Sequence, residues 1–204
     1  HSLSVMLKPA SGQCNMHCDY CFYCDEMEQR AQASYGFMSE ETLQNVIRKT
    51  MLNADREISF SYQGGEPTLA GLAFFEKAVE LQRKYNRKGI RVHNALQTNG
   101  YALNEKWCQF FARHQFLIGL SIDGVQETHD AYRHGRILQD KEQKTGQSRF
   151  RIPIESETCE TDIVQGQKNQ TYERALHAAD LLKRYNVDFN ILTVVNRQTA
   201  ARIE

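Results

Sequence analysis

The sequence lacks several features that would assign it early to a class of protein. No apolar stretch approaches the roughly 18 residues that span a bilayer, so we expect no membrane partner. Lys plus Arg and Asp plus Glu both number 25, which gives a formal net charge of zero. Because there is also no long basic run, we expect nucleic acid not to be the main partner.

The start of the chain carries no secretory signal, although the chain has six cysteines. A length of 204 residues fits one domain, or a large piece of one, that buries its own core without a disulfide framework. In a reducing cytoplasm thiols serve metals or catalysis. We therefore expect a cytoplasmic enzyme with metal-binding or catalytic cysteines.

Three of these cysteines, Cys14, Cys18 and Cys21, lie on one short segment with the spacing C-x3-C-x2-C. A structural zinc site takes four ligands, usually in two pairs, and a ferredoxin-type [4Fe–4S] cluster also takes four thiolates. Three thiols with no fourth at a fixed spacing predict a [4Fe–4S] cluster with one open iron. S-adenosylmethionine binds such an iron through its amine and carboxylate, and one-electron reduction of its sulfonium produces a radical.

A zinc site remains an alternative at this point. Cys21-Phe-Tyr-Cys24 adds a second C-x2-C, so Cys24 is a possible fourth ligand. Scattered thiols with no common ligand are the third interpretation. Cys108 falls in a predicted helix and Cys159 in a polar segment, so neither is expected to bind the cluster.

Apolar segments typical of strands alternate along the chain with amphipathic helical segments. Strands are predicted at residues 4–8, 57–62, 91–97, 116–122 and 188–195. Helices are predicted after the N-cap Ser39, around residues 74–85, at 105–113 and at 172–185, and a fifth begins before the chain stops. This alternation predicts an α/β fold with a parallel sheet and right-handed crossovers.

One segment interrupts the alternation. Residues 134–170 are polar and rich in Gln, Lys, Glu and Thr. A loop of this length within a compact domain is uncommon. We expect a mobile surface insertion there.

Polar and glycine-rich motifs follow the predicted strands. They are Gly64-Gly65-Glu66-Pro67, Gln97-Thr-Asn-Gly100 and Ser121-Ile-Asp-Gly124, with Arg133 a little further on. The carboxyl ends of parallel strands meet at one edge of the sheet, where active sites of such folds lie. Glu66 is expected to accept from an ammonium and Arg133 to bind a carboxylate. Each motif alone is a common turn, but their joint placement predicts a site.

Longer runs resemble one known family. They are Lys8-Pro-Ala-Ser-Gly-Gln-Cys14, Cys21-Phe-Tyr23, Gln63-Gly-Gly-Glu-Pro-Thr-Leu-Ala-Gly71, Leu96-Gln-Thr-Asn-Gly100, Gly119-Leu-Ser-Ile-Asp-Gly124, His129-Asp130 with Arg133, and Phe189-Asn-Ile-Leu-Thr-Val-Val-Asn196. Together they closely resemble the anaerobic sulfatase-maturating enzymes, which are radical-SAM proteins of the SPASM-containing group. The resemblance covers nearly everything outside residues 134–170.

That resemblance implies a partial (βα)6 TIM-like barrel, here truncated within its fifth βα unit. It implies a [4Fe–4S] cluster on Cys14, Cys18 and Cys21. The residues implied to contact S-adenosylmethionine are Tyr20, Gly65, Ser121 and Arg133, together with the motif residues Gly64 and Glu66. The implied partners are a sulfatase polypeptide and an electron donor such as flavodoxin or ferredoxin.

The implied reaction begins with reductive cleavage of S-adenosylmethionine to a 5′-deoxyadenosyl radical. That radical takes a Cβ hydrogen from a Cys or Ser of the sulfatase, which ends as Cα-formylglycine. In the family the catalytic aspartate lies beyond residue 204, so no catalytic residue is assigned. We therefore expect the 204 residues to form an incomplete radical-SAM core. The alternatives are another SPASM-type peptide-modifying enzyme and a non-catalytic metal-binding fragment.

Overall fold

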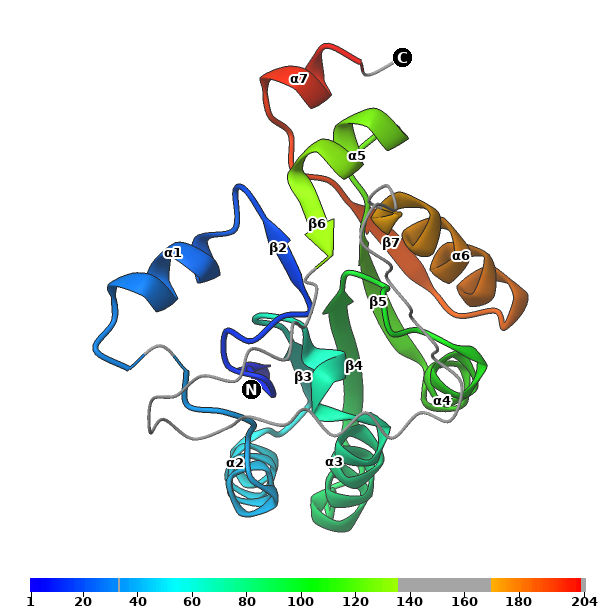
Figure 1. Ribbon diagram of the computed structural model, residues 1–204. Helices are drawn as coiled ribbons and strands as arrows, with labels where there is room; N and C mark the ends of the chain where they lie inside the picture. Colours follow the sequence, from blue (N-terminus) through cyan, green and yellow to red (C-terminus); the bar gives the residue numbers. More distant parts are fainter. Residues whose placement is uncertain (33, 136–169, 203–204) are drawn as a thin grey trace.

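The fold is built on an open, parallel five-stranded sheet (Figure 1). The computed structural model describes residues 1–32, 34–135 and 170–202. The strands are β1 (Ser2–Leu7), β3 (Glu57–Tyr62), β4 (Arg91–Thr98), β5 (Phe116–Ser121) and β7 (Phe189–Leu192), in the order β1-β3-β4-β5-β7. Chain order and spatial order therefore agree, as successive βα units require.

Four long helices connect these strands and lie along one face of the sheet (Figure 1). They are α2 (Glu40–Asn53), α3 (Leu72–Tyr85), α4 (Glu105–His114) and α6 (Thr171–Arg184). Ser39 caps α2 as predicted, because its hydroxyl accepts from the backbone N–H of Thr42. No helix in the described ranges is long and apolar enough to cross a membrane.

Side chains alternate between the two faces of the sheet. Ile58, Phe60 and Tyr62 of β3 are fully buried toward the helices, whereas Ser59 and Ser61 between them are only half-buried. The same alternation holds in β5, where Leu120 is buried and Leu117 is 43% exposed. One face therefore carries the apolar core, whereas on the opposite, concave face the described residues place none of these four helices but several polar side chains.

The predicted α/β class and the parallel sheet are confirmed, and an open sheet is what a partial barrel provides. The last strand ends earlier than predicted, at Leu192 rather than Val195. Beyond it the Thr193 hydroxyl donates to the carbonyl of Ile122, just past the end of the neighbouring strand β5.

Several short elements escaped the sequence patterns. They are β2 (Met16–Cys18), α1 (Phe22–Gln29), the 3₁₀ helix η1 (Pro67–Ala70), α5 (Gln126–Tyr132) and β6 (Arg133–Gly135), whereas α7 (Arg197–Ala200) is the fifth helix that the sequence predicted. Three-residue strands have no periodicity from which to predict them. Of the segment 134–170, in which an insertion is expected, His134 and Gly135 belong to β6. Residues 136–169, and Cys159 with them, lie outside the described residues.

The two faces of β5 provide a direct test of this arrangement. We expect Leu120→Ala to lower the free energy of unfolding by about 2–5 kcal/mol, because it leaves a cavity in the core. Leu117→Ala removes the same atoms from the exposed face, so its cost should stay below about 1 kcal/mol. Urea denaturation of both variants measures the difference. Equal losses would contradict the assignment of the two faces.

Candidate active site

The cysteine-bearing loop leaves β1 and packs directly on the glycine motif that follows β3. The backbone N–H of Glu66 donates to the carbonyl of Gln13 at 2.7 Å. Gly65 has a φ of +53°, and a Cβ at this position would lie 2.0 Å from the oxygen of Gln13. Only glycine permits this contact. The close approach that the glycines allow is thus to the cysteine loop itself.

Glu66 is 1% exposed, and protein donors occupy both of its carboxylate oxygens. Oε1 accepts from the N–H and hydroxyl of Thr68 and from the hydroxyl of Thr98, and Oε2 accepts from the N–H of Asn99. Burial raises the pKa of Glu66, and these hydrogen bonds offset part of that rise. The sequence predicted an ammonium acceptor here. In the structure the carboxylate instead joins the end of β3 to the end of β4.

Cys14 lies beside this junction. Its Sγ accepts from the backbone N–H of Met16 at 3.4 Å, and the side-chain amide of Asn99 lies 3.6 Å away. Burial is the main cause that raises the pKa of Cys14 to about 12, and the negative charge of Glu66 adds to the rise. A thiol in such a place ionises only when a cation compensates, as an iron or zinc ligand does. The chemistry of this thiol therefore fits a metal-bound role.

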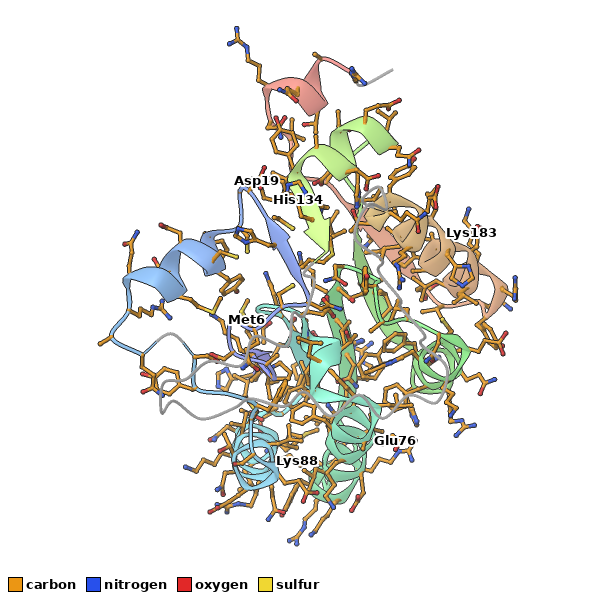
Figure 2. The ribbon with its side chains drawn as sticks, viewed as in Figure 1. Met6, Asp19, Glu76, Lys88, His134 and Lys183 are labelled. Atoms are coloured by element: carbon orange, nitrogen blue, oxygen red, sulfur yellow. The ribbon has the colours of Figure 1, made fainter. Side chains whose placement is uncertain are left out.

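Cys18 is positioned by a small antiparallel pair of strands, β2 and β6, in which Cys18 lies opposite Arg133. An ion pair between Asp19 and His134, 3.1 Å apart, supports the same pair of strands (Figure 2). Burial raises the pKa of Cys18 to about 11, and Arg133 opposes that rise. The pairing brings Arg133, far along the chain, to the cysteine loop.

Tyr20 and Arg133 meet on a single buried carboxylate, that of Asp123. The Tyr20 hydroxyl and Arg133 Nε both donate to Oδ2 of Asp123, the latter at 2.8 Å. The backbone N–H of Val194 donates to Oδ1 at 2.9 Å. Burial raises the pKa of Asp123, but Tyr20, Arg133 and Val194 outweigh it and hold that pKa below its usual value. Asp123 is therefore an anion in the fold.

Ser121 ends β5 two residues before Asp123 and is buried. By alternation its side chain shares the concave face with Leu117. The structure thus brings the predicted residues Cys14, Cys18, Tyr20, Gly64, Gly65, Ser121 and Arg133 to the carboxyl end of the sheet. Cys21 follows one turn after Cys18, because its N–H donates to the carbonyl of Cys18. Asp123 was missed, since in sequence it reads as half of an Asp-Gly turn.

The zinc alternative requires thiols much closer together than a cluster does. A tetrahedral zinc holds its thiolates roughly 4 Å apart, whereas each thiolate of a [4Fe–4S] cluster binds a separate iron. Across the described ranges, no three His, Cys, Asp or Glu side chains are grouped to hold one ion. Cys24, the fourth ligand considered, has its Sγ 3.3 Å from Nδ1 of His17.

One buried polar atom beside the cysteines lacks a partner among the described residues, namely Oε1 of Gln13. An unpaired buried acceptor costs free energy unless a donor reaches it. A bound molecule with an ammonium or hydroxyl group supplies such a donor. The site therefore fits S-adenosylmethionine next to the cluster cysteines.

His129 provides a pH-dependent prediction. Its Nδ1 accepts from the N–H of Asp123 at 3.2 Å, and burial, aided by Arg133, lowers its pKa to about 4. The pKa of a His in the unfolded chain is about 6.5. The contribution of the neutral, buried His129 to the free energy of unfolding is therefore complete above pH 6.5 and falls progressively toward pH 4. We expect a loss of about 2 kcal/mol between pH 7 and pH 5 from His129 alone.

His129→Asn retains an acceptor but does not titrate, so its free energy of unfolding should fall less over this pH range. Urea titrations at both pH values measure the difference between variant and parent. His177→Asn makes the same substitution at an exposed histidine and serves for comparison. If His129→Asn leaves the pH dependence unchanged, His129 is not a buried neutral group.

Comparison with known proteins places this arrangement in a family. The model of the radical SAM superfamily matches residues 9–142. The cysteine-type anaerobic sulfatase-maturating enzyme of Clostridium perfringens (strain ATCC 13124) is 40% identical over 201 residues, covering 98% of this chain and 46% of the relative. The serine-type enzyme of Klebsiella aerogenes is 34% identical over 200 residues, covering 97% of this chain and 41% of the relative.

A solved structure, native anSMEcpe with bound AdoMet and Kp18Cys peptide, matches with a TM-score of 0.78 at 39% identity. The match covers all of this chain and 46% of that one. The chain thus spans less than half the length of the relatives that it matches. With the family model matching residues 9–142 and the three-cysteine loop at the carboxyl end of a parallel sheet, the chain belongs to the radical SAM superfamily.

Proposed function

We propose that this chain is the core of a radical-SAM enzyme that oxidises a Cys or Ser of a sulfatase to Cα-formylglycine. The observation that carries the proposal is the packing of the three-cysteine loop against the glycine motif and the Arg133 strand, all at one end of the sheet. The similarity to both cysteine-type and serine-type sulfatase-maturating enzymes supports the choice of reaction.

In this proposal Cys14, Cys18 and Cys21 hold a [4Fe–4S] cluster. Bound together, the cluster and S-adenosylmethionine supply reductive cleavage to methionine and a 5′-deoxyadenosyl radical, the hydrogen-abstracting species. Because that cleavage consumes an electron, the enzyme needs a donor such as flavodoxin or ferredoxin.

The side chains of the site have separate tasks in binding S-adenosylmethionine. Arg133 suits its carboxylate through charge-assisted hydrogen bonds. Tyr20 and Ser121 contact the molecule from the cysteine loop and from the end of β5. Gly64, Gly65 and Glu66 contribute through their backbone, since donors fill the Glu66 carboxylate.

The concave face suits a polypeptide substrate. The polar Ser59, Ser61 and Gln97 on this face are half-buried, and the apolar Met6 and Leu117 beside them are exposed. After the substrate loses a Cβ hydrogen to the radical, one electron to an oxidised iron–sulfur cluster and one proton to a base, serine yields the aldehyde directly. Cysteine first yields a thioaldehyde, which water hydrolyses to the aldehyde with release of hydrogen sulfide. Another peptide-modifying activity of the same chemistry is the second candidate, and the reaction product distinguishes the two.

The cluster ligands are tested by replacing cysteines one at a time. After anaerobic reconstitution, the parent should contain about four iron and four sulfide per chain. Alanine at position 14, 18 or 21 removes a thiolate, and we expect loss of the iron and of the broad brown absorption. Cys24→Ala is the matched control and should retain both. If Cys24→Ala loses the cluster as completely as Cys18→Ala, the assignment of three ligands and an open iron is wrong.

The reaction is tested with peptides that span the modified residue of a sulfatase, one carrying Cys and one carrying Ser. The reduced full-length protein with S-adenosylmethionine should release 5′-deoxyadenosine and convert the residue to formylglycine, followed by mass spectrometry. A peptide with Ala at the same position is the control. A crosslinked product, or no aldehyde despite 5′-deoxyadenosine release, would favour the second candidate.

A further inference from the structure

We propose that Asp123 is a positioning residue that orients Tyr20 and Arg133 for S-adenosylmethionine. The proposal rests on the function proposed above, because it concerns how that cofactor is held. Nothing in the sequence motifs distinguishes Asp123 from an ordinary Asp-Gly turn.

The first observation is how many separate parts of the chain converge on this one residue. Asp123 is fully buried, and its carboxylate accepts from Tyr20, Arg133 and Val194, which lie in the cysteine loop, in β6 and after β7. Tyr20 and Val194 are separated from it by 103 and 71 positions in the chain. One carboxylate therefore fixes the relative placement of three segments around the end of β5.

The second observation is that the main chain of Asp123 is fixed as well. Its N–H donates to Nδ1 of His129, and its carbonyl accepts from the hydroxyl of Thr128 at 2.8 Å. Both partners belong to α5. The carboxylate therefore has little freedom to follow its partners, and the partners must adopt the orientation that it sets.

The third observation concerns which atom of Arg133 donates to Asp123. Asp123 binds Nε, at the inner end of the guanidinium, and the Arg133 side chain is only 8% exposed. Because the guanidinium is planar, a bond at Nε determines where its two Nη atoms point. The Tyr20 ring lies 5.7 Å from Cζ of the same group. The two residues proposed to grip the cofactor are thus aligned by one shared acceptor.

A purely structural role for Asp123 makes a different prediction from a positioning role. A structural carboxylate lowers stability when it is changed, and its effect on cofactor affinity does not depend on Arg133. A positioning carboxylate acts through Arg133 and Tyr20, so most of its effect on affinity disappears when Arg133 can no longer make its contacts, and only the part through Tyr20 remains. A double-mutant cycle measures this coupling.

The experiment compares the parent, Asp123→Asn, Arg133→Lys and the double variant, all anaerobically reconstituted in the full-length protein. S-adenosylmethionine affinity is measured by calorimetric titration, which requires no turnover. We expect Asp123→Asn to weaken binding at least tenfold in the parent and by a clearly smaller factor, about threefold, in the Arg133→Lys background, where only its effect through Tyr20 remains. Equal factors in both backgrounds would overturn the proposal.

Asp130→Asn is the matched control. Asp130 undergoes the same chemical change, and its Oδ1 accepts from the hydroxyl and N–H at the start of α6, on Thr171 and Tyr172. We expect it to lower the thermal unfolding midpoint while changing affinity less than twofold. If Asp130→Asn weakens S-adenosylmethionine binding as much as Asp123→Asn does, the loss of any carboxylate near α5 weakens binding. That result would overturn the proposal.

Tyr20→Phe keeps the test decisive if Asp123→Asn does not fold. It removes only the hydroxyl that donates to Asp123, and we expect three- to tenfold weaker binding in the parent and a smaller factor in the Arg133→Lys background. Independent effects of the two changes would contradict the shared acceptor. If the parent itself binds no S-adenosylmethionine, the proposed function fails and this inference fails with it. If the parent binds and Asp123→Asn binds equally well, only the inference fails.

Discussion

The rest of the site depends on one buried carboxylate, that of Glu66. It has no access to water, so protein donors must satisfy both of its oxygens, and they come from η1 and from the end of β4. Its own N–H is bonded to the cysteine loop. Asn99, held by Glu66 through its backbone, turns its side chain toward Cys14. Three strand ends are thus locked together before any cofactor binds.

Asp123 plays a comparable part at the other side of the site. Both carboxylates lie just beyond strand ends, and both are surrounded by donors from distant parts of the chain. Such networks are costly when incomplete and rigid when complete. Rigidity suits a site in which a reactive species must be produced at a fixed place, since every donor is already oriented.

Sequence patterns predicted the long elements well, because each has a strong physical signal. The buried, alternating residues of β3 and the capped, amphipathic α2 follow from periodicity and from Ser39. The strands β2 and β6 could not be predicted, since three residues show no period and their partner is more than a hundred positions away. The donors around Glu66 could not be predicted for a related reason: a carboxylate in a glycine-rich loop has the same sequence context whether donors or solvent surround it.

By itself, the sequence determined the class of fold and the cysteine loop, because local spacing dictates both. Alternating strands and helices form a parallel sheet, and C-x3-C-x2-C puts three thiols on one loop. Only the tertiary structure decided which polar groups meet. Gly65 against Gln13, Arg133 opposite Cys18, and Tyr20 with Arg133 on Asp123 are contacts between distant segments. The packing of strand ends sets such contacts, and no local pattern in the chain encodes them.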